Sequence, residues 1–311
     1  MNNLSRQGPS PLSRIFVSSN GIRVGWLLAI FLVLYSAMTL GAQFAFATIP
    51  SLRLWAASQP YRLITPIGQI AFTGLELIIL LTSISLVSKL ERRSFADYGL
   101  SQPKTIGNRL SLGLLIGFGM ASLLIGLIAI AGGYSAHGLA ISGPEILTNA
   151  CLYGFGFLLV ALFEEFAFRG YLQATLQRGI GFWPAAVLLS IAFGAVHLPN
   201  LGGAWFASLV AASFGLVAAF SVQRTGSLWF IIGAHAAFDW GTTFFYSAPI
   251  AGLSARGHLM NASLQGPTWL TGGNAGPVGS IFAFAVFALA GLMIHLTFRR
   301  SPALASTRQE K

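Results

Sequence analysis

Eight long apolar runs constrain what this chain can fold into. They lie near residues 24–46, 63–88, 110–131, 150–173, 183–198, 204–222, 227–247 and 278–298. Roughly 20 residues of helix cross the hydrocarbon core of a bilayer, which is about 30 Å thick. Since backbone groups in lipid must be paired within the segment, such runs form helices. We therefore predict an all-α, polytopic helical bundle of about eight transmembrane helices, placed in the cell membrane as a multi-pass protein.

The composition agrees with this prediction. Of 311 residues, 55% are hydrophobic and 8% are charged, whereas soluble domains carry roughly 25% charged residues. We expect a polar cytoplasmic arm at 1–23, a single transmembrane bundle at 24–300 and a cytoplasmic tail at 301–311. The first run is interpreted as retained, because it is too long for the apolar region of a signal peptide. The single cysteine, Cys151, excludes an internal disulfide.

Basic residues are distributed unevenly between the two sets of connections. One set holds Arg53, Arg62 and Arg256. The other set, which includes the N-terminus, holds Arg6, Arg14, Arg23, Lys89, Arg92, Arg93, Lys104, Arg109, Arg169, Arg178, Arg224, Arg299, Arg300, Arg308 and Lys311. The bias stays the same if Arg169 lies within the membrane. Because cytoplasmic loops are enriched in Lys and Arg, both termini are expected to be cytoplasmic. This topology explains the net charge of +10, and no nucleic-acid partner is expected, since the basic residues do not cluster with aromatics on one soluble face.

Two further stretches bear on packing. Gly113 and Gly117 have the GxxxG spacing that is typical of closely packed membrane helices. We assign this pair no chemistry. The segment 248–277 is rich in Gly, Ser and Asn and is expected to be the longest external loop.

Four of the eight carboxylates, Glu76, Glu164, Glu165 and Asp239, fall inside apolar runs. A charge at the centre of a membrane helix costs about 2.5–3.5 kcal/mol on insertion scales, so such groups usually face the bundle interior and have a partner. Glu165 and Arg169 form an i,i+4 pair on one helical face and can neutralise each other. Glu164 points about 100° away from Glu165, so it is expected to face a different partner.

Two histidines are candidates for that partner. His197 ends the fifth run, and His235 lies four residues before Asp239 in the seventh. A glutamate, two histidines and an aspartate from three helices are the ingredients of a water-activating hydrolytic site, although each group alone can also be a packing residue. As the runs are drawn, His197 lies at the external end of its helix, whereas Glu164 and His235 lie near mid-depth. The fifth helix must therefore start deep or be short and tilted.

Three motifs follow one another on three of these runs: Glu164-Glu165-x-x-x-Arg169, Phe193-x-x-x-His197 and His235-x-x-x-Asp239. With this pattern, the stretch from about 150 to 247 resembles the CPBP intramembrane metalloproteases, also known as the CAAX protease and bacteriocin-processing or Abi family. The resemblance implies a protease-like core at 150–247 and peptide-bond hydrolysis without a covalent enzyme intermediate.

The resemblance also implies a role for each residue. Glu164 would act as general base on a water held by His197, and His235 with Asp239 would orient the substrate carbonyl or stabilise its oxyanion. The best-known prenyl-protein members have Asn at the last position, and an Asp donates a hydrogen bond only when protonated. Glu164, His197 and His235 could hold a zinc ion with one open position, while water activation by Glu and His alone would serve as well. Both possibilities stay open.

The expected partners are the lipid bilayer and a membrane-associated protein or peptide substrate. Prenylated CaaX proteins, leader peptides and membrane-protein termini are all compatible with the sequence, which does not indicate an oligomeric state. Two alternatives to an endopeptidase stay open. One is a proteolytically silent membrane scaffold or regulator, and the other is a small-molecule or proton-coupled transporter in which the charges form an ion pathway.

Overall fold

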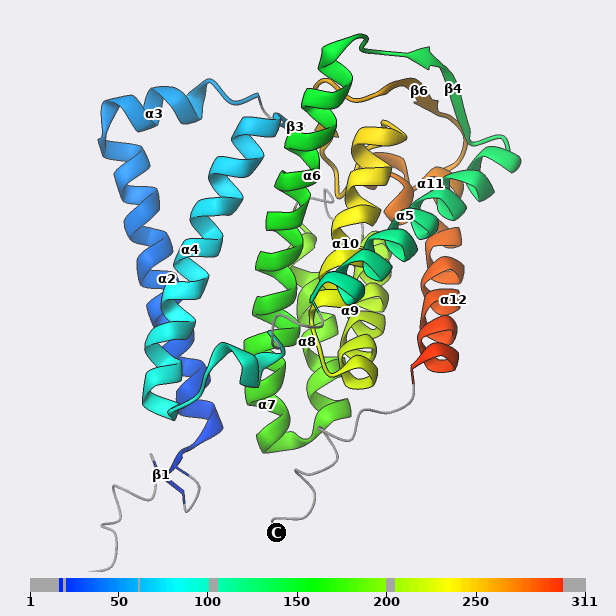
Figure 1. The fold of residues 1–311 in the computed structure, drawn as a ribbon. Helices are drawn as coiled ribbons and strands as arrows, with labels where there is room; N and C mark the ends of the chain where they lie inside the picture. The colour runs from blue at the N-terminus through cyan, green and yellow to red at the C-terminus, as the bar shows by residue number, and fades with distance from the viewer. Residues whose placement is uncertain (1–16, 19–20, 61, 101–105, 200–204, 299–311) are drawn as a thin grey trace, which may run out of the picture.

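The bundle is built almost entirely from helices (Figure 1). The computed structural model describes residues 17–18, 21–60, 62–100, 106–199 and 205–298, so the expected tail and most of the expected arm lie outside the described residues. Five described helices are long and apolar enough to cross a membrane: α2 (Val24–Thr48), α4 (Pro66–Glu91), α5 (Ile106–Ile130), the continuous helix Pro144–Ile180 and α9 (Trp205–Thr225). The predicted all-helical membrane bundle is confirmed.

The other three predicted runs form shorter helices. They are α8 (Phe182–His197), α10 (Trp229–Trp240), which a π-helical turn, η4 (Gly241–Phe245), continues, and α12 (Ile281–Thr297). α8 has 16 residues and α12 has 17. At 1.5 Å per residue, neither reaches about 30 Å as a straight helix. The count of eight spans and the side on which the termini lie therefore stay predictions.

The central helix of the bundle has three parts that follow one another without a break. α6 (Pro144–Glu165) leads into the π-helical segment η3 (Phe166–Leu172), and α7 (Gln173–Ile180) completes the 37 residues. Gly181, with φ of 84°, then turns the chain back into α8. This backbone conformation suits glycine, because a side chain there would be strained.

The segments that connect the helices carry small elements of regular structure. β3 (Leu63–Ile64) pairs in parallel with β5 (Ser254–Ala255), and β4 (Tyr134–Leu139) pairs antiparallel with β6 (Met260–Leu264). The remaining short elements are β1 (Val17–Ser18), β2 (Gly21–Ile22), α3 (Pro50–Ala57), η1 (Phe95–Tyr98), α11 (Thr268–Thr271), η5 (Gly273–Ala275) and η6 (Pro277–Gly279). The segment 248–277, expected to be the longest external loop, connects η4 to α12 and contains short regular elements. Its backbone pairs with β3 and β4, and it forms a cap over one end of the bundle (Figure 1).

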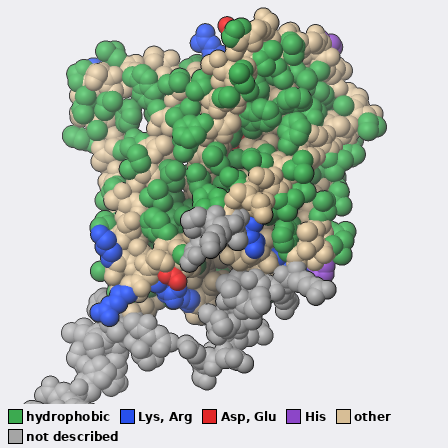
Figure 2. All heavy atoms as spheres, viewed as in Figure 1, with side chains coloured by type: hydrophobic (Ala, Val, Ile, Leu, Met, Phe, Trp, Pro, Cys, Tyr) green, Lys and Arg blue, Asp and Glu red, His purple; other side chains and the backbone are tan. Residues whose placement is uncertain are grey.

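Figure 2 shows the surface that a membrane requires. Hydrophobic side chains cover the middle of the visible face, while Lys and Arg side chains gather mainly toward the lower end. Many of these exposed side chains are large, such as Phe44, Leu115 and Ile130. A contiguous exposed apolar surface marks contact with lipid or with another protein. Here the surface lies on helices that are long enough to cross a bilayer, which agrees with contact with lipid.

Helices α5 and α10 pack backbone to backbone through glycine. A β-carbon on Gly117 would lie 2.0 Å from the carbonyl oxygen of Ala234, and one on Gly113 would lie 2.1 Å from that of Phe230. From the opposite helix, a β-carbon on Gly233 would lie 2.4 Å from the carbonyl oxygen of Leu110. The close packing that the GxxxG spacing predicts is therefore present, and it fixes the position of the helix that carries His235 and Asp239.

We predict that Gly117→Ala separates these two helices and lowers stability by about 1–3 kcal/mol, the usual cost of overpacking. Thermal unfolding in detergent measures the change. The matched control is Gly119→Ala on the same helix, where an added β-carbon meets no atom within 4 Å. An unfolding temperature for Gly117→Ala equal to that of the control would contradict the packing role.

Candidate active site

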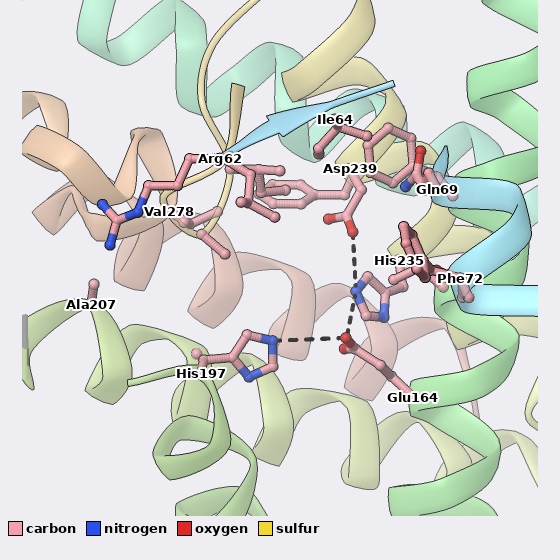
Figure 3. A pocket seen from close by; sticks show the side chains of 18 of the residues that line it. Arg62, Ile64, Gln69, Phe72, Glu164, His197, Ala207, His235, Asp239 and Val278 are labelled. Carbon is pink, nitrogen blue, oxygen red and sulfur yellow. Dashed lines mark ion pairs between the residues drawn. The ribbon is translucent and has the colours of Figure 1, made fainter. Parts of the chain in front are cut away.

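The candidate site lies where the central helix, α8 and α10 meet at the inner end of a cavity. Figure 3 shows Glu164, His197, His235 and Asp239 facing one another, with dashed lines that join Glu164 to both histidines and His235 to Asp239. The cavity has a volume of about 430 Å³, a size common for ligand pockets. Side chains such as Phe157, Val160 and Phe238 give it largely apolar walls.

Glu165 is the fully buried centre of the polar cluster. Its carboxylate lies 3.2 Å from Nη1 of Arg169, which confirms the predicted pair. It also accepts a hydrogen bond of 2.8 Å from Nδ1–H of His235, a contact that was not predicted. Glu165 therefore ties the central helix to α10 and fixes which nitrogen of His235 carries a proton.

Three aromatic rings surround the guanidinium group of Arg169. Its central carbon lies 4.2 Å from the ring centroid of Phe193, 5.7 Å from that of Phe168 and 5.8 Å from that of Phe214. Rings at these distances stabilise a cation through their electron-rich faces. Gly215 leaves room for the group, since a β-carbon there would lie 3.0 Å from Nη2. The buried arginine is thus held by one carboxylate and by a wall of aromatics.

Glu164 is placed differently from its neighbour. Its side chain is 19% exposed, whereas that of Glu165 is 0% exposed, and it lines the cavity. Its Oε1 lies 3.8 Å from Nε2 of His197 and its Oε2 lies 3.8 Å from Nε2 of His235. These distances exceed a hydrogen bond, and a gap of this kind between polar groups is one that a water molecule can bridge.

His197 lies at the depth of Glu164 because α8 is short. The helix starts directly after the turn at Gly181 and ends at His197, which resolves the mismatch in depth that the sequence left open. Nδ1–H of His197 donates to the carbonyl oxygen of Phe193 at 2.7 Å. In the neutral ring, Nε2 is then the unprotonated nitrogen, and it is the one that faces Glu164.

Phe193 and Phe214 connect the parts of the site. The ring centroid of Phe193 lies 4.6 Å from that of His197, so this side chain touches both His197 and Arg169. Phe214 presents its ring to His235 at 4.9 Å. Phe193 was noted as part of a motif without a role. Phe214 and Gly215 of α9 were missed, because no charge or periodic pattern distinguishes them in an apolar run.

The structure leaves other predicted candidates outside the cluster. Glu76 of α4 lies within electrostatic range of Glu164 but does not line the cavity. His137 and His258 lie in the cap, and Arg224 donates to His295 near the end of α12, so all three histidines lie outside the cluster. The cavity walls also include Gln69, Phe72 and Thr73 of α4, which no motif indicated.

The residues predicted as zinc ligands come together without forming a metal-holding set. Glu164 faces both His197 and His235, but Nε2 of His235 is also 3.4 Å from Oδ2 of Asp239. Within the described residues, no group of three or more His, Cys, Asp or Glu side chains has an arrangement that could hold a metal ion. No step of the chemistry below is therefore assigned to a metal.

Residues 146–241 match the family model described as Rce1-like, type II CAAX prenyl endopeptidase. This match agrees with the resemblance that the three motifs indicated. The matched segment contains all six candidate site residues, but it does not include α4 or the cap. Neither the curated proteins nor the solved structures contain a match to this chain.

We predict that Glu165→Gln leaves the Arg169 guanidinium buried without a counter-ion and destabilises the bundle by about 3–5 kcal/mol, the usual cost of removing one partner of a buried pair. Thermal unfolding and expression level measure the loss. The double variant Glu165→Gln/Arg169→Met removes both charges and should recover part of the stability. A single variant as stable as the unaltered protein, or a double variant less stable than the single one, would contradict this role.

Proposed function

We propose that this chain is an intramembrane endopeptidase that hydrolyses peptide bonds of membrane-associated or lipidated polypeptides, as in CAAX-type or leader-peptide processing. The match to Rce1-like endopeptidases supports the reaction class. The bundle of apolar helices supports a substrate that enters from or lies at a membrane. The site supports the chemistry, because its polar groups converge at the inner end of an apolar cavity.

The observation that carries the proposal is the contrast between two adjacent glutamates. Glu165 is buried and bound to Arg169 and His235, so its negative charge is already paired. Glu164 is 19% exposed and faces the cavity, and Nε2 of each histidine lies 3.8 Å from its carboxylate, beyond hydrogen-bond distance. A carboxylate in this state can accept a proton from a water that lies between it and His197.

The proposed first step is the attack of that water on the scissile carbonyl carbon. The water donates one hydrogen bond to Glu164 and one to Nε2 of His197, which leaves its oxygen lone pairs directed at the substrate. As the oxygen bonds to carbon, its proton passes to Glu164. Glu164 then gives this proton to the leaving nitrogen as the carbon–nitrogen bond breaks, so that a carboxylic acid and an amine are released.

His235 is assigned the stabilisation of the negative charge that develops on the carbonyl oxygen. Its Nδ1–H is engaged with Glu165, so only the imidazolium form can donate from Nε2. A carboxylate faces each ring nitrogen, Glu165 at 2.8 Å and Asp239 at 3.4 Å. A donor fixed in this way before the reaction is the usual means of stabilising an oxyanion. Asp239 would orient His235 rather than donate, which accounts for Asp in place of Asn.

We predict that Glu164→Gln yields a folded protein with cleavage reduced by roughly 10²–10⁴-fold, because the amide keeps the shape but cannot accept the proton. Cleavage of a peptide library by purified protein in detergent measures activity, and thermal unfolding serves as the control for folding. Normal turnover by Glu164→Gln, together with a stable but inactive Glu165→Gln, would make Glu165 the base. A folded protein that cleaves no peptide would favour the scaffold alternative.

Zinc is tested separately. The proposed steps use only Glu164, His197 and His235. We therefore predict that protein treated with a chelator, and shown by elemental analysis to contain no metal, keeps its cleavage activity. Loss of activity on chelation, with recovery on addition of zinc but not of magnesium, would instead establish the zinc-dependent alternative. In either outcome the Glu164→Gln comparison still decides whether the chain is a hydrolase.

A further inference from the structure

The cavity is confined to one half of the bundle. Its deepest polar residues, such as Glu164, lie within the central helix, and its outer wall comes from the start of α4 and the start of α9, with Gly68 and Ala207 among the lining residues. Residues 59–60, 62–65, 250–251 and 253 form the rim near the cap. No lining residue among those described comes from η1, α7 or the last turns of α4 and α9. The cavity therefore leads from the site toward the cap.

Between the site and the end opposite to the cap, the bundle is filled with packed side chains. Tyr98, Phe166 and Tyr171 are at most 2% exposed, and the rings of Tyr98 and Tyr171 meet edge to face at 5.3 Å. Oε1 of Glu91 accepts a hydrogen bond of 2.5 Å from Arg178, and its Oε2 accepts one of 2.9 Å from Tyr98. These contacts join α4, η1 and the central helix at the end opposite to the cap. Among the described residues, this end offers a substrate no open route to the site.

The same closed end carries most of the described basic residues that lie outside the apolar core. Arg53, Arg62 and Arg256 lie at the cap end, whereas the closed end has Arg23, Lys89, Arg92, Arg93, Arg109, Arg178 and Arg224 (Figure 2). Basic residues accumulate on the cytoplasmic side of membrane proteins. The closed end is therefore the end expected in the cytoplasm, and the rim of the cavity faces the opposite side.

We infer that this site takes its substrates from the non-cytoplasmic face of the membrane. The inference rests on the proposed function for the reaction, and it narrows the substrate class. The substrate is an exported or membrane-anchored polypeptide whose cleavage site lies on the outer side, such as the segment next to a membrane anchor. Of the two substrate classes in the proposed function, the inference selects leader or anchor segments of exported polypeptides over lipidated C-termini that stay in the cytoplasm.

Cysteine accessibility in sealed right-side-out vesicles tests which face the cavity opens to. In a Cys151→Ser background, which removes the natural thiol, Ala211→Cys places a thiol on the cavity wall. The matched control is Ala218→Cys, two turns further along the same helix, where the side chain is 0% exposed. Arg93→Cys places a thiol on the surface of the basic end. The probe is a small, charged maleimide that does not cross membranes.

We expect Ala211→Cys to react in sealed vesicles to the same extent as in opened ones, Arg93→Cys to react only after opening, and Ala218→Cys to react in neither. Reaction of Ala211→Cys only after opening would overturn the inference, as would reaction of Ala211→Cys and Arg93→Cys from the same side. A cavity thiol that reacts in neither preparation would show that the cavity is closed to water, which also overturns it. Thermal unfolding of each variant checks that the bundle is intact.

This labelling does not depend on proteolysis, so it separates the inference from the proposed function. If a peptide cleaved in detergent is found, the same peptide added outside sealed vesicles should be cleaved only when they are right-side-out. Cleavage only by inside-out vesicles would overturn the inference while the proposed function stands. Absence of cleavage in detergent, with the expected labelling pattern, would overturn the proposed function while the orientation of the cavity stands.

Discussion

The buried carboxylate of Glu165 is the interaction on which the rest of this site depends. It binds Arg169 of the same helix and His235 of α10, and all three side chains are at most 8% exposed. A charge in this environment is tolerated only with partners, so the helices must come together for any of the three to be stable. The pairing therefore fixes the relative position of the central helix and α10 before any substrate is considered.

This arrangement gives two neighbouring glutamates opposite states. Consecutive residues of a helix point about 100° apart, and here one direction leads into the packed interior and the other into the cavity. In the interior direction, Glu165 contacts Arg169 and His235. Glu164 consequently presents its carboxylate to the cavity, while its neighbour Glu165 is paired in the interior.

The sequence identified candidate site residues mainly where a residue type is energetically unfavourable in its segment. Glu164, Glu165, Arg169 and Asp239 could be identified because charge inside an apolar run is costly. The GxxxG spacing indicated that α5 packs closely against another helix, but it did not indicate that this helix is α10. Phe214 and Gly215 could not be found in this way, since an apolar residue in an apolar run carries no signal of what it touches. The π-helical segments, the folded cap and the depth of His197 also depend on how separate helices meet, which a single run does not reveal.

The length of α8 explains how a cavity can exist at this depth. The central helix descends through 37 residues, about 55 Å at 1.5 Å per residue, and α8 returns for only 16 residues, about 24 Å. Its last residue, His197, therefore stops beside Glu164 instead of continuing toward the cap. A helix of full membrane length would extend into the volume that His197, Ala207 and Ala211 now line. One short helix thus places His197 level with Glu164 and leaves the cavity open beyond it.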